Sequence, residues 1–158
     1  MRISRIVGAA ALGIVTVGVA QPAFGFANPL AYYTPSAPLT AYDDGVAQAQ
    51  MYGLFLVTNA TYLHNDTYQR DPRPGGDRVF ERTQFNYYMF SAAHNAKIWI
   101  EKSEQQSAKT DTSAWYWQYD RHAFPGSAEK GQMETQVCED HGWLPDPCSP
   151  WPRWTTDL

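Results

Sequence analysis

The sequence predicts an all-β fold, a two-sheet antiparallel sandwich, and three observations lead to that prediction. Polar and apolar residues alternate along several segments, as is typical of half-buried strands. Proline, glycine and polar clusters separate these segments at short intervals. Aromatic residues, which favour strands, make up 15% of the chain. About six short strands of this kind favour a sandwich, with a small barrel as the nearest alternative.

The clearest strands form a hairpin within residues 78–103. The first is predicted over Val79–Phe90 and the second over Ala96–Lys102, joined by a short connector. Apolar side chains occupy every second position of the second strand, and Trp99 falls on its otherwise polar face. Alanines near the connector also fit a helical period, so a helix is the alternative. The strict alternation after Ala96 favours strands.

A buried central strand is predicted over Met51–Val57, the most apolar run after the N-terminal region. This strand could begin at Ala47, and a helix over Asp44–Ala60 is its alternative. Residues 103–113 are polar and predict an exposed loop. The remaining strands are predicted at Thr61–Tyr68, Ala114–Asp120 and Gln132–Cys138.

The N-terminus has the pattern of a secretory signal peptide over residues 1–27. Arg2 and Arg5 precede an uncharged run, and small residues follow near Gly25 and Ala27, where cleavage is expected. An uncleaved anchor helix is the alternative. The apolar run is short for a transmembrane helix, which needs about 20 residues. We therefore expect a secreted protein with no membrane span in its mature form.

Cleavage after residue 27 would leave 131 residues, which is enough for one domain with a real core. Residues 28–44 are rich in proline and tyrosine and predict an extended arm, either disordered or laid along the domain. Residues 45–158 are expected to form a single domain. Its tail after Gly142, rich in proline and tryptophan, is predicted to be irregular and anchored by its tryptophans.

The charge balance argues against nucleic acid as a partner. The formal net charge is −4 for the whole chain and −6 without Arg2 and Arg5. The remaining basic residues are dispersed along the sequence, whereas a phosphate backbone requires a concentrated basic surface.

Two cysteines, Cys138 and Cys148, are predicted to form a disulfide, because an exported chain meets oxidising conditions. The bond would close a short loop and stabilise the fold by about 2.5–3 kcal/mol on the chain-entropy model. The spacing is not that of a redox-active pair separated by two residues.

The order of these features resembles that of small secreted actinobacterial proteins of unknown function. The matching segments lie within residues 45–149 and are Ala96–Glu101, Val137–Glu139 and Asp146–Ser149. The resemblance implies a disulfide-closed β-sandwich. It implies no established activity and supplies no catalytic residues.

Histidine and aspartate recur at a spacing of two residues. His64 and Asp66 share one strand face, and Asp120 and His122 have the same spacing near the end of another strand. Four such ligands could hold zinc if the pairs met. Nothing in the sequence places the pairs together, so we predict two exposed strand pairs and no metal or cofactor.

The loop before Val79 has a faint likeness to small guanyl-specific ribonucleases. Their chemistry needs an arginine, a carboxylate and a histidine, and Arg78, Glu81 and His94 supply these types. The helix and the preceding histidine–glutamate arrangement of such enzymes are missing. Hydrolysis of RNA therefore stays an alternative.

Aromatic residues provide the candidate contact site. Trp115, Trp117 and Tyr119 occupy alternate positions of one strand, about 7 Å apart from i to i+2, so they share a face. Such a row, together with Trp99, could stack on sugar rings. Packing in the core is the alternative, and exposure to solvent distinguishes the two.

No catalytic motif stands out, so the expected function is a non-enzymatic extracellular binding or structural role. The partner would be a polysaccharide of the cell envelope or another protein. Two alternatives remain: a small secreted hydrolase such as a ribonuclease, and a secreted inhibitor whose disulfide loop, Glu139–Pro147, makes the contact.

Overall fold

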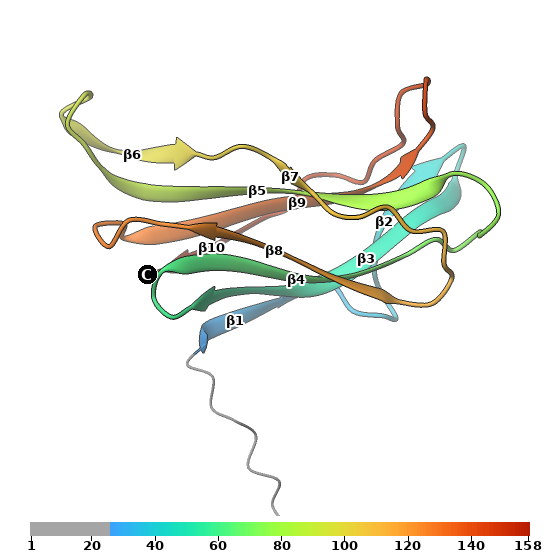
Figure 1. Ribbon diagram of the computed structural model, residues 1–158, viewed down its shortest axis with the longest axis horizontal. Helices are drawn as coiled ribbons and strands as arrows, with labels where there is room; N and C mark the ends of the chain where they lie inside the picture. Colours follow the sequence, from blue (N-terminus) through green and yellow to red (C-terminus); the bar gives the residue numbers. More distant parts are fainter. Residues whose placement is uncertain (1–25) are drawn as a thin grey trace, which may run out of the picture.

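The computed structural model describes residues 26–158, which form two antiparallel β-sheets stacked face to face (Figure 1). The all-β prediction is confirmed, because these residues contain ten strands and no helix. Accordingly, the described part of the chain has no helix that is long and apolar enough to span a membrane. Residues 1–25, which hold most of the predicted signal peptide, lie outside the described residues.

Five strands form one sheet, which we call sheet A. Its order is β1-β3-β4-β8, and β2 pairs with β3 as well. The strands are β1 (Phe26–Tyr32), β2 (Leu39–Asp43), β3 (Val46–Thr58), β4 (Tyr62–Arg70) and β8 (Tyr116–Ala123).

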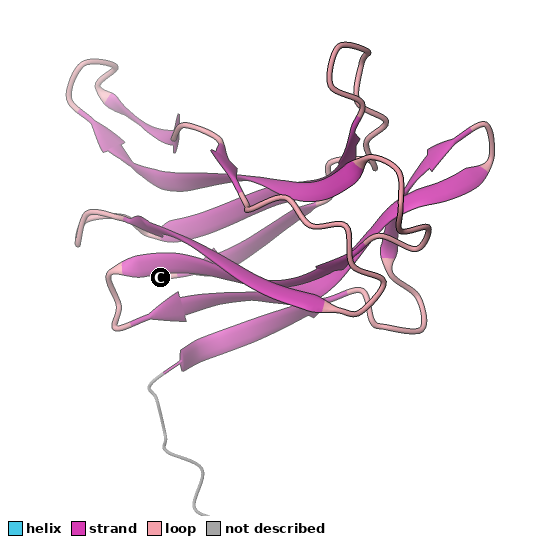
Figure 2. Cartoon of the chain, turned by 45° about the vertical axis from the view of Figure 1, so that its right-hand side comes forward, coloured by secondary structure: helices cyan, strands magenta, loops and turns pink. Residues whose placement is uncertain are grey.

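The other five strands form sheet B, in the order β10-β9-β5-β6, with β7 also paired to β5. The strands are β5 (Arg78–Ser91), β6 (Ala96–Glu101), β7 (Gln105–Gln106), β9 (Lys130–Asp140) and β10 (Arg153–Asp157). Figure 2 shows the two layers and the loops that join them.

The predicted hairpin is confirmed as β5 and β6, which pair from Ser91 opposite Ala96 to Asn86 opposite Glu101. Within sheet B, β5 lies inside the sheet, whereas β6 lies at its edge. The apolar run at Met51–Val57 belongs to β3, so the strand interpretation of that region is confirmed over the helical one.

The prediction of about six strands was too low, because both ends of the domain add strands. Residues 28–44, predicted as an extended arm, are extended and lie along the domain: they contribute to β1 and β2, and both strands pair with β3. Pro29 lies where the β1 register shifts between Ala27 and Leu30, so its missing N–H costs no regular ladder bond. Strands therefore form here despite the prolines.

The C-terminal tail also ends in a strand. Arg153–Asp157 is β10 and pairs with β9. The tryptophans of the tail differ in their environment: Trp154 packs on Tyr32 with 4.6 Å between ring centroids, whereas Trp143 is 89% exposed. The expectation that the tryptophans act together as anchors was wrong for Trp143.

The predicted disulfide between Cys138 and Cys148 is present. It ties the segment before β10 to β9, and the backbone N–H of Ser149 donates to the carbonyl of Val137 at 2.9 Å beside it. The bond therefore fixes the path that brings the tail back to sheet B.

The polar stretch 103–113, predicted as an exposed loop, connects the two sheets along one side. Its residues Gln105–Gln106 form β7 on β5. Further along, the carbonyl of Thr112 accepts from the backbone N–H of Asp71 at 2.9 Å, and Thr110 exchanges two backbone bonds with Val79. The stretch is thus held by backbone pairing despite its polar sequence.

The apolar core lies between the sheets and is built from alternate residues of both. Its fully covered side chains include Met51, Phe55, Leu63, Val79, Phe85, Met133 and Val137. Other inward positions of the same strands carry polar residues near the middle of the sandwich.

Candidate functional site

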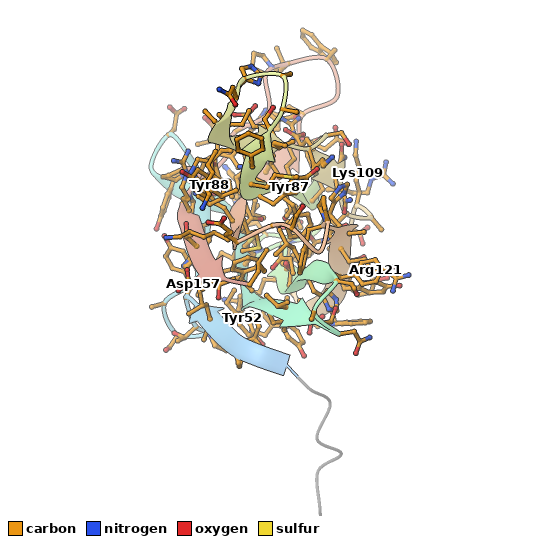
Figure 3. All side chains as sticks on the ribbon, turned by 90° about the vertical axis from the view of Figure 1, so that its left-hand side faces the viewer. Tyr52, Tyr87, Tyr88, Lys109, Arg121 and Asp157 are labelled. Atoms are coloured by element: carbon orange, nitrogen blue, oxygen red, sulfur yellow. A yellow bond between two sulfur atoms is a disulfide. The ribbon has the colours of Figure 1, made fainter. Side chains whose placement is uncertain are left out.

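The outer face of sheet A carries a cluster of aromatic rings, which we call the aromatic platform: Tyr52, Tyr68, Trp115, Trp117 and Tyr119. Strand register explains the cluster, because Tyr52 is opposite Tyr68 and Tyr68 is opposite Trp117. Tyr119 follows two residues later on the same face of β8. Figure 3 labels Tyr52 on β3 and Arg121 on β8.

The rings of the platform contact one another. Tyr52 and Tyr68 are stacked with centroids 5.0 Å apart, and Trp115 meets Tyr52 edge-on at 4.8 Å. Trp117 and Tyr119 are stacked at 5.4 Å. Such contacts orient the rings before any ligand arrives.

Two rings of the platform are open to solvent. Trp117 is 49% exposed and Tyr119 is 50% exposed, whereas Trp115 is half-buried. The core-packing alternative therefore does not describe Trp117 and Tyr119, which point away from the space between the sheets. A flat surface of exposed rings remains.

Trp99 lies apart from the other three predicted contact residues. It is on β6 of sheet B, is 37% exposed and packs against Tyr88 with centroids 5.4 Å apart. The structure therefore brings together Trp115, Trp117 and Tyr119 but not Trp99.

Two arginines border the platform. The guanidinium of Arg70 lies over the Trp115 ring at 4.3 Å from its centroid, and its Nε donates to Gln50 at 2.9 Å. The guanidinium of Arg121 lies 5.2 Å from the Tyr62 centroid. Neither arginine was predicted as part of the site, because the predicted strands ended at Tyr68 and Asp120, whereas β4 continues to Arg70 and β8 to Ala123.

A shallow hollow of about 330 Å³ lies beside the exposed rings. It is lined by Thr58, Asn59, His64, Trp117, Tyr119 and Arg121. His64 meets Tyr119 edge-on at 5.5 Å and lies 3.4 Å from the Asp66 carboxylate. Burial lowers the pKa of His64, against the opposing effect of Asp66, so the hollow presents a neutral imidazole near pH 7.

The inner face of the same strands carries a buried polar cluster, which we call the polar centre: Tyr32, Asn65, Thr67, Glu81, Thr83 and Thr135. Asn65 connects its parts, because it accepts from the Tyr32 hydroxyl at 2.6 Å and donates to Glu81 at 2.5 Å. The Thr135 hydroxyl also donates to Glu81, at 3.1 Å. All six side chains are buried.

The carboxyl group of Glu81 is protonated at neutral pH. Burial raises the pKa of Glu81 to about 8, and the nearby charge of Asp120 adds to the rise. Burial also raises the pKa of Asp120, against a hydrogen bond to Glu81. One oxygen of each carboxyl group, Glu81 Oε2 and Asp120 Oδ2, is buried without another partner, so the two groups are placed to share a proton.

The three residues of the ribonuclease alternative do not meet. Arg78 begins β5, Glu81 is fully buried in the polar centre, and His94 lies in the turn after β5, where it bonds Ser91 at 3.0 Å. Glu81 cannot reach a substrate from inside the sandwich. The arrangement therefore lacks the base that such hydrolysis needs.

The two histidine–aspartate pairs also stay apart. His64 and Asp66 lie on the outer face, whereas Asp120 and His122 are opposite Asn65 and Leu63 and face inward. Within residues 26–158 no group of three or more His, Cys, Asp and Glu side chains is placed to hold a metal ion.

The disulfide loop adjoins a polar hollow of about 500 Å³ lined in part by Arg73, Asp77, Glu139 and His141. His141 and Glu139 form an ion pair at 2.8 Å, and the hydrogen bond to Glu139 raises the pKa of His141. At the tip of the loop, Trp143 is 89% exposed.

Residues 26–158 thus form a two-sheet antiparallel sandwich with one disulfide and with the aromatic platform on the outer face of sheet A. No family model, curated protein or solved structure matches the chain significantly. The resemblance to small secreted actinobacterial proteins stays a prediction.

Proposed function

We propose that this protein is exported and binds extracellular glycan, without catalysis, through the aromatic platform. The observation that carries the proposal is the stacked pair of Trp117 and Tyr119, each about half exposed on one flat sheet face. The disulfide between Cys138 and Cys148 supports export, because such bonds persist in oxidising compartments.

The chemistry of the platform suits a sugar ring. Aromatic faces stack on the apolar face of a pyranose, and the ring hydroxyls then need hydrogen-bonding partners at the rim. The hollow beside Tyr119 supplies such partners in Asn59, Thr58 and Arg121. The rings are already held in contact, so binding costs little ordering of side chains.

Co-sedimentation with insoluble chitin, cellulose and peptidoglycan tests the proposal. The double substitution Trp117→Ala and Tyr119→Ala removes two rings worth about 1 kcal/mol or more each in a binding site, so retention on the bound polymer should fall at least roughly tenfold. Trp143→Ala is the matched control, since it removes an exposed tryptophan from the far loop. Equal retention of the double variant and the parent would contradict the proposal.

The inhibitor function is a second candidate because of one observation at the disulfide loop. Trp143 and Leu144 are 89% and 48% exposed on a loop closed by the Cys138–Cys148 bond. A constrained loop with apolar side chains at its tip suits insertion into a partner's pocket. Protease inhibition that is lost in Trp143→Ala but kept in the Trp117 and Tyr119 double variant would favour this function.

A further inference from the structure

We propose that the glycan bound by the platform is acidic, a sugar chain whose rings carry carboxylates, and that Arg121 recognises the carboxylate. The inference rests on the proposed function and concerns the same surface. It starts from the charges that border the exposed rings.

The outer face of sheet A is locally positive in an acidic protein. At the outward positions of β3, β4 and β8 the charged side chains are Asp66, Arg70 and Arg121. The two guanidiniums flank the rings, although the chain as a whole has a net charge of −4. This part of the surface therefore attracts an anionic ligand despite the negative net charge of the chain.

Neither guanidinium is neutralised by a carboxylate. Of the six arginines within residues 26–158, two form ion pairs: Arg82 with Glu104 and Asp146, and Arg153 with Glu134. The ion pairs found within residues 26–158 include neither Arg70 nor Arg121, whose guanidiniums lie over aromatic rings instead. A guanidinium with free N–H donors can bind a carboxylate through two parallel hydrogen bonds.

The position of Arg121 fits such a ligand. Trp117, Tyr119 and Arg121 occupy successive outward positions of β8, about 7 Å apart, and all three line the same hollow. A pyranose stacked on Tyr119 would therefore direct a substituent on its ring toward the guanidinium. The exposed Arg121 side chain can reach that substituent without changes in the backbone.

Asp66 is the one carboxylate that opposes an acidic ligand here. Its side chain is 26% exposed, and one of its oxygens is buried 3.4 Å from His64. Because the carboxylate is largely covered while Arg121 is exposed, the guanidinium dominates the field at the mouth of the hollow.

A single-stranded nucleic acid combines flat rings with negative charge and is the competing ligand for such a surface. Its backbone carries one charge per nucleotide, so it needs a continuous basic groove. Two arginines on an acidic chain do not provide that groove. We therefore favour the glycan as the ligand, and binding of a nucleic acid is measured as the competing result.

The test compares polygalacturonate with the same polymer after methyl esterification, which masks the carboxylates but keeps the sugar rings. Titration calorimetry on length-matched fragments should give at least roughly tenfold tighter binding of the free acid, because the ester cannot form the charge-assisted hydrogen bonds of a carboxylate with the guanidinium. Arg121→Gln should remove most of that difference. Arg153→Gln, a substitution on sheet B, should leave it unchanged.

The outcomes separate the two proposals. Equal binding of the acid and the ester, lost in the Trp117 and Tyr119 double variant, would overturn the acidic preference and keep the glycan function. Binding of neither polymer by the folded protein would overturn the acidic preference, and co-sedimentation with chitin, cellulose and peptidoglycan would then decide the glycan function separately. Tighter binding of oligothymidylate than of polygalacturonate would also overturn the inference, and Arg121→Gln must keep the parent's circular dichroism spectrum.

Discussion

Several positions on the two faces of β4 and β8 have the opposite polarity from that expected for a sandwich. Facing the core are Asn65 and Thr67, with Asp120 beside them, whereas Tyr68, Trp117 and Tyr119 face outward. Polar groups are normally exposed and large rings normally buried. The two departures have different physical explanations.

The inner departure is tolerated because most of its polar atoms are hydrogen-bonded, with Glu81 Oε2 and Asp120 Oδ2 as the exceptions. Tyr32, Asn65, Glu81 and Thr135 satisfy one another across both sheets, and protonation removes the charge of Glu81. The outward rings of Trp117 and Tyr119 are not fully covered by any segment within residues 26–158, and both stay half exposed. An exposed aromatic surface of this kind favours a binding role, whereas a buried, hydrogen-bonded polar network favours a structural role.

The largest effect is expected from the inner face. Asn65→Leu keeps the branched shape and the number of side-chain heavy atoms but leaves the Tyr32 hydroxyl and Glu81 without their shared partner, so the free energy of unfolding should fall by about 3–5 kcal/mol. Urea denaturation measures the change. Ser103→Ala, at an exposed position after β6, should change stability by less than about 0.5 kcal/mol. Similar values for both variants would contradict a structural role for the polar centre.

Stability should also depend on pH through Glu81. The folded protein holds this proton up to about pH 8, whereas the unfolded chain releases it near the ordinary value of 4.5. The contribution of Glu81 to the free energy of unfolding should therefore fall by roughly 1.4 kcal/mol per unit as the pH rises between these values. Glu81→Gln should flatten the profile in this window. A parent and a variant with equal slopes would contradict the assignment.

Gly53 should tolerate no side chain. A Cβ there would collide with the Tyr32 hydroxyl and the backbone carbonyl of Asp66. We expect Gly53→Ala to destabilise the fold by about 2 kcal/mol, through overpacking and displacement of Tyr32 from Asn65. Thermal unfolding measures this loss. Gly126→Ala, where a Cβ meets open space, is the control and should melt close to the parent.

The smallest effect on stability is expected at the outer face. Trp117→Ala combined with Tyr119→Ala should change the free energy of unfolding by about 1 kcal/mol or less, because both rings are half exposed. The same variant should lose glycan binding. A large loss of stability by urea denaturation would instead assign these rings a structural role, and the contrast between the two faces would fail.

Local patterns predicted the parts of the fold that depend on near neighbours in sequence. Alternation located the β5–β6 hairpin and the shared face of Trp115, Trp117 and Tyr119, and an exported chain with two cysteines indicated the disulfide. Strands β1 and β10 were not predicted, because nearby prolines usually exclude regular strands. Here Pro29 lies at a register shift and Pro152 lies just before β10. The position of a proline in the sequence does not show whether the strand needs a backbone N–H donor there.

The polar centre could not be predicted because it depends on contacts between sheets. Nothing local distinguishes Asn65 from an exposed asparagine, and Glu81 lies in a strand that alternates as ordinary strands do. Burial follows from the register of β4 against β8 and from the stacking of β4 on β5, which only the folded arrangement defines. Arg121 was missed because β8 continues to Ala123.

Nuclear magnetic resonance of the tryptophan indoles tests the central claim most directly, since each of the six tryptophans gives its own N–H signal. On titration with oligogalacturonate, the signals of Trp115 and Trp117 should shift together and saturably, while those of Trp99 and Trp143 stay in place. Shifts confined to Trp143, or no shift at either platform tryptophan with any of the glycans named above, would contradict binding at the outer face of sheet A.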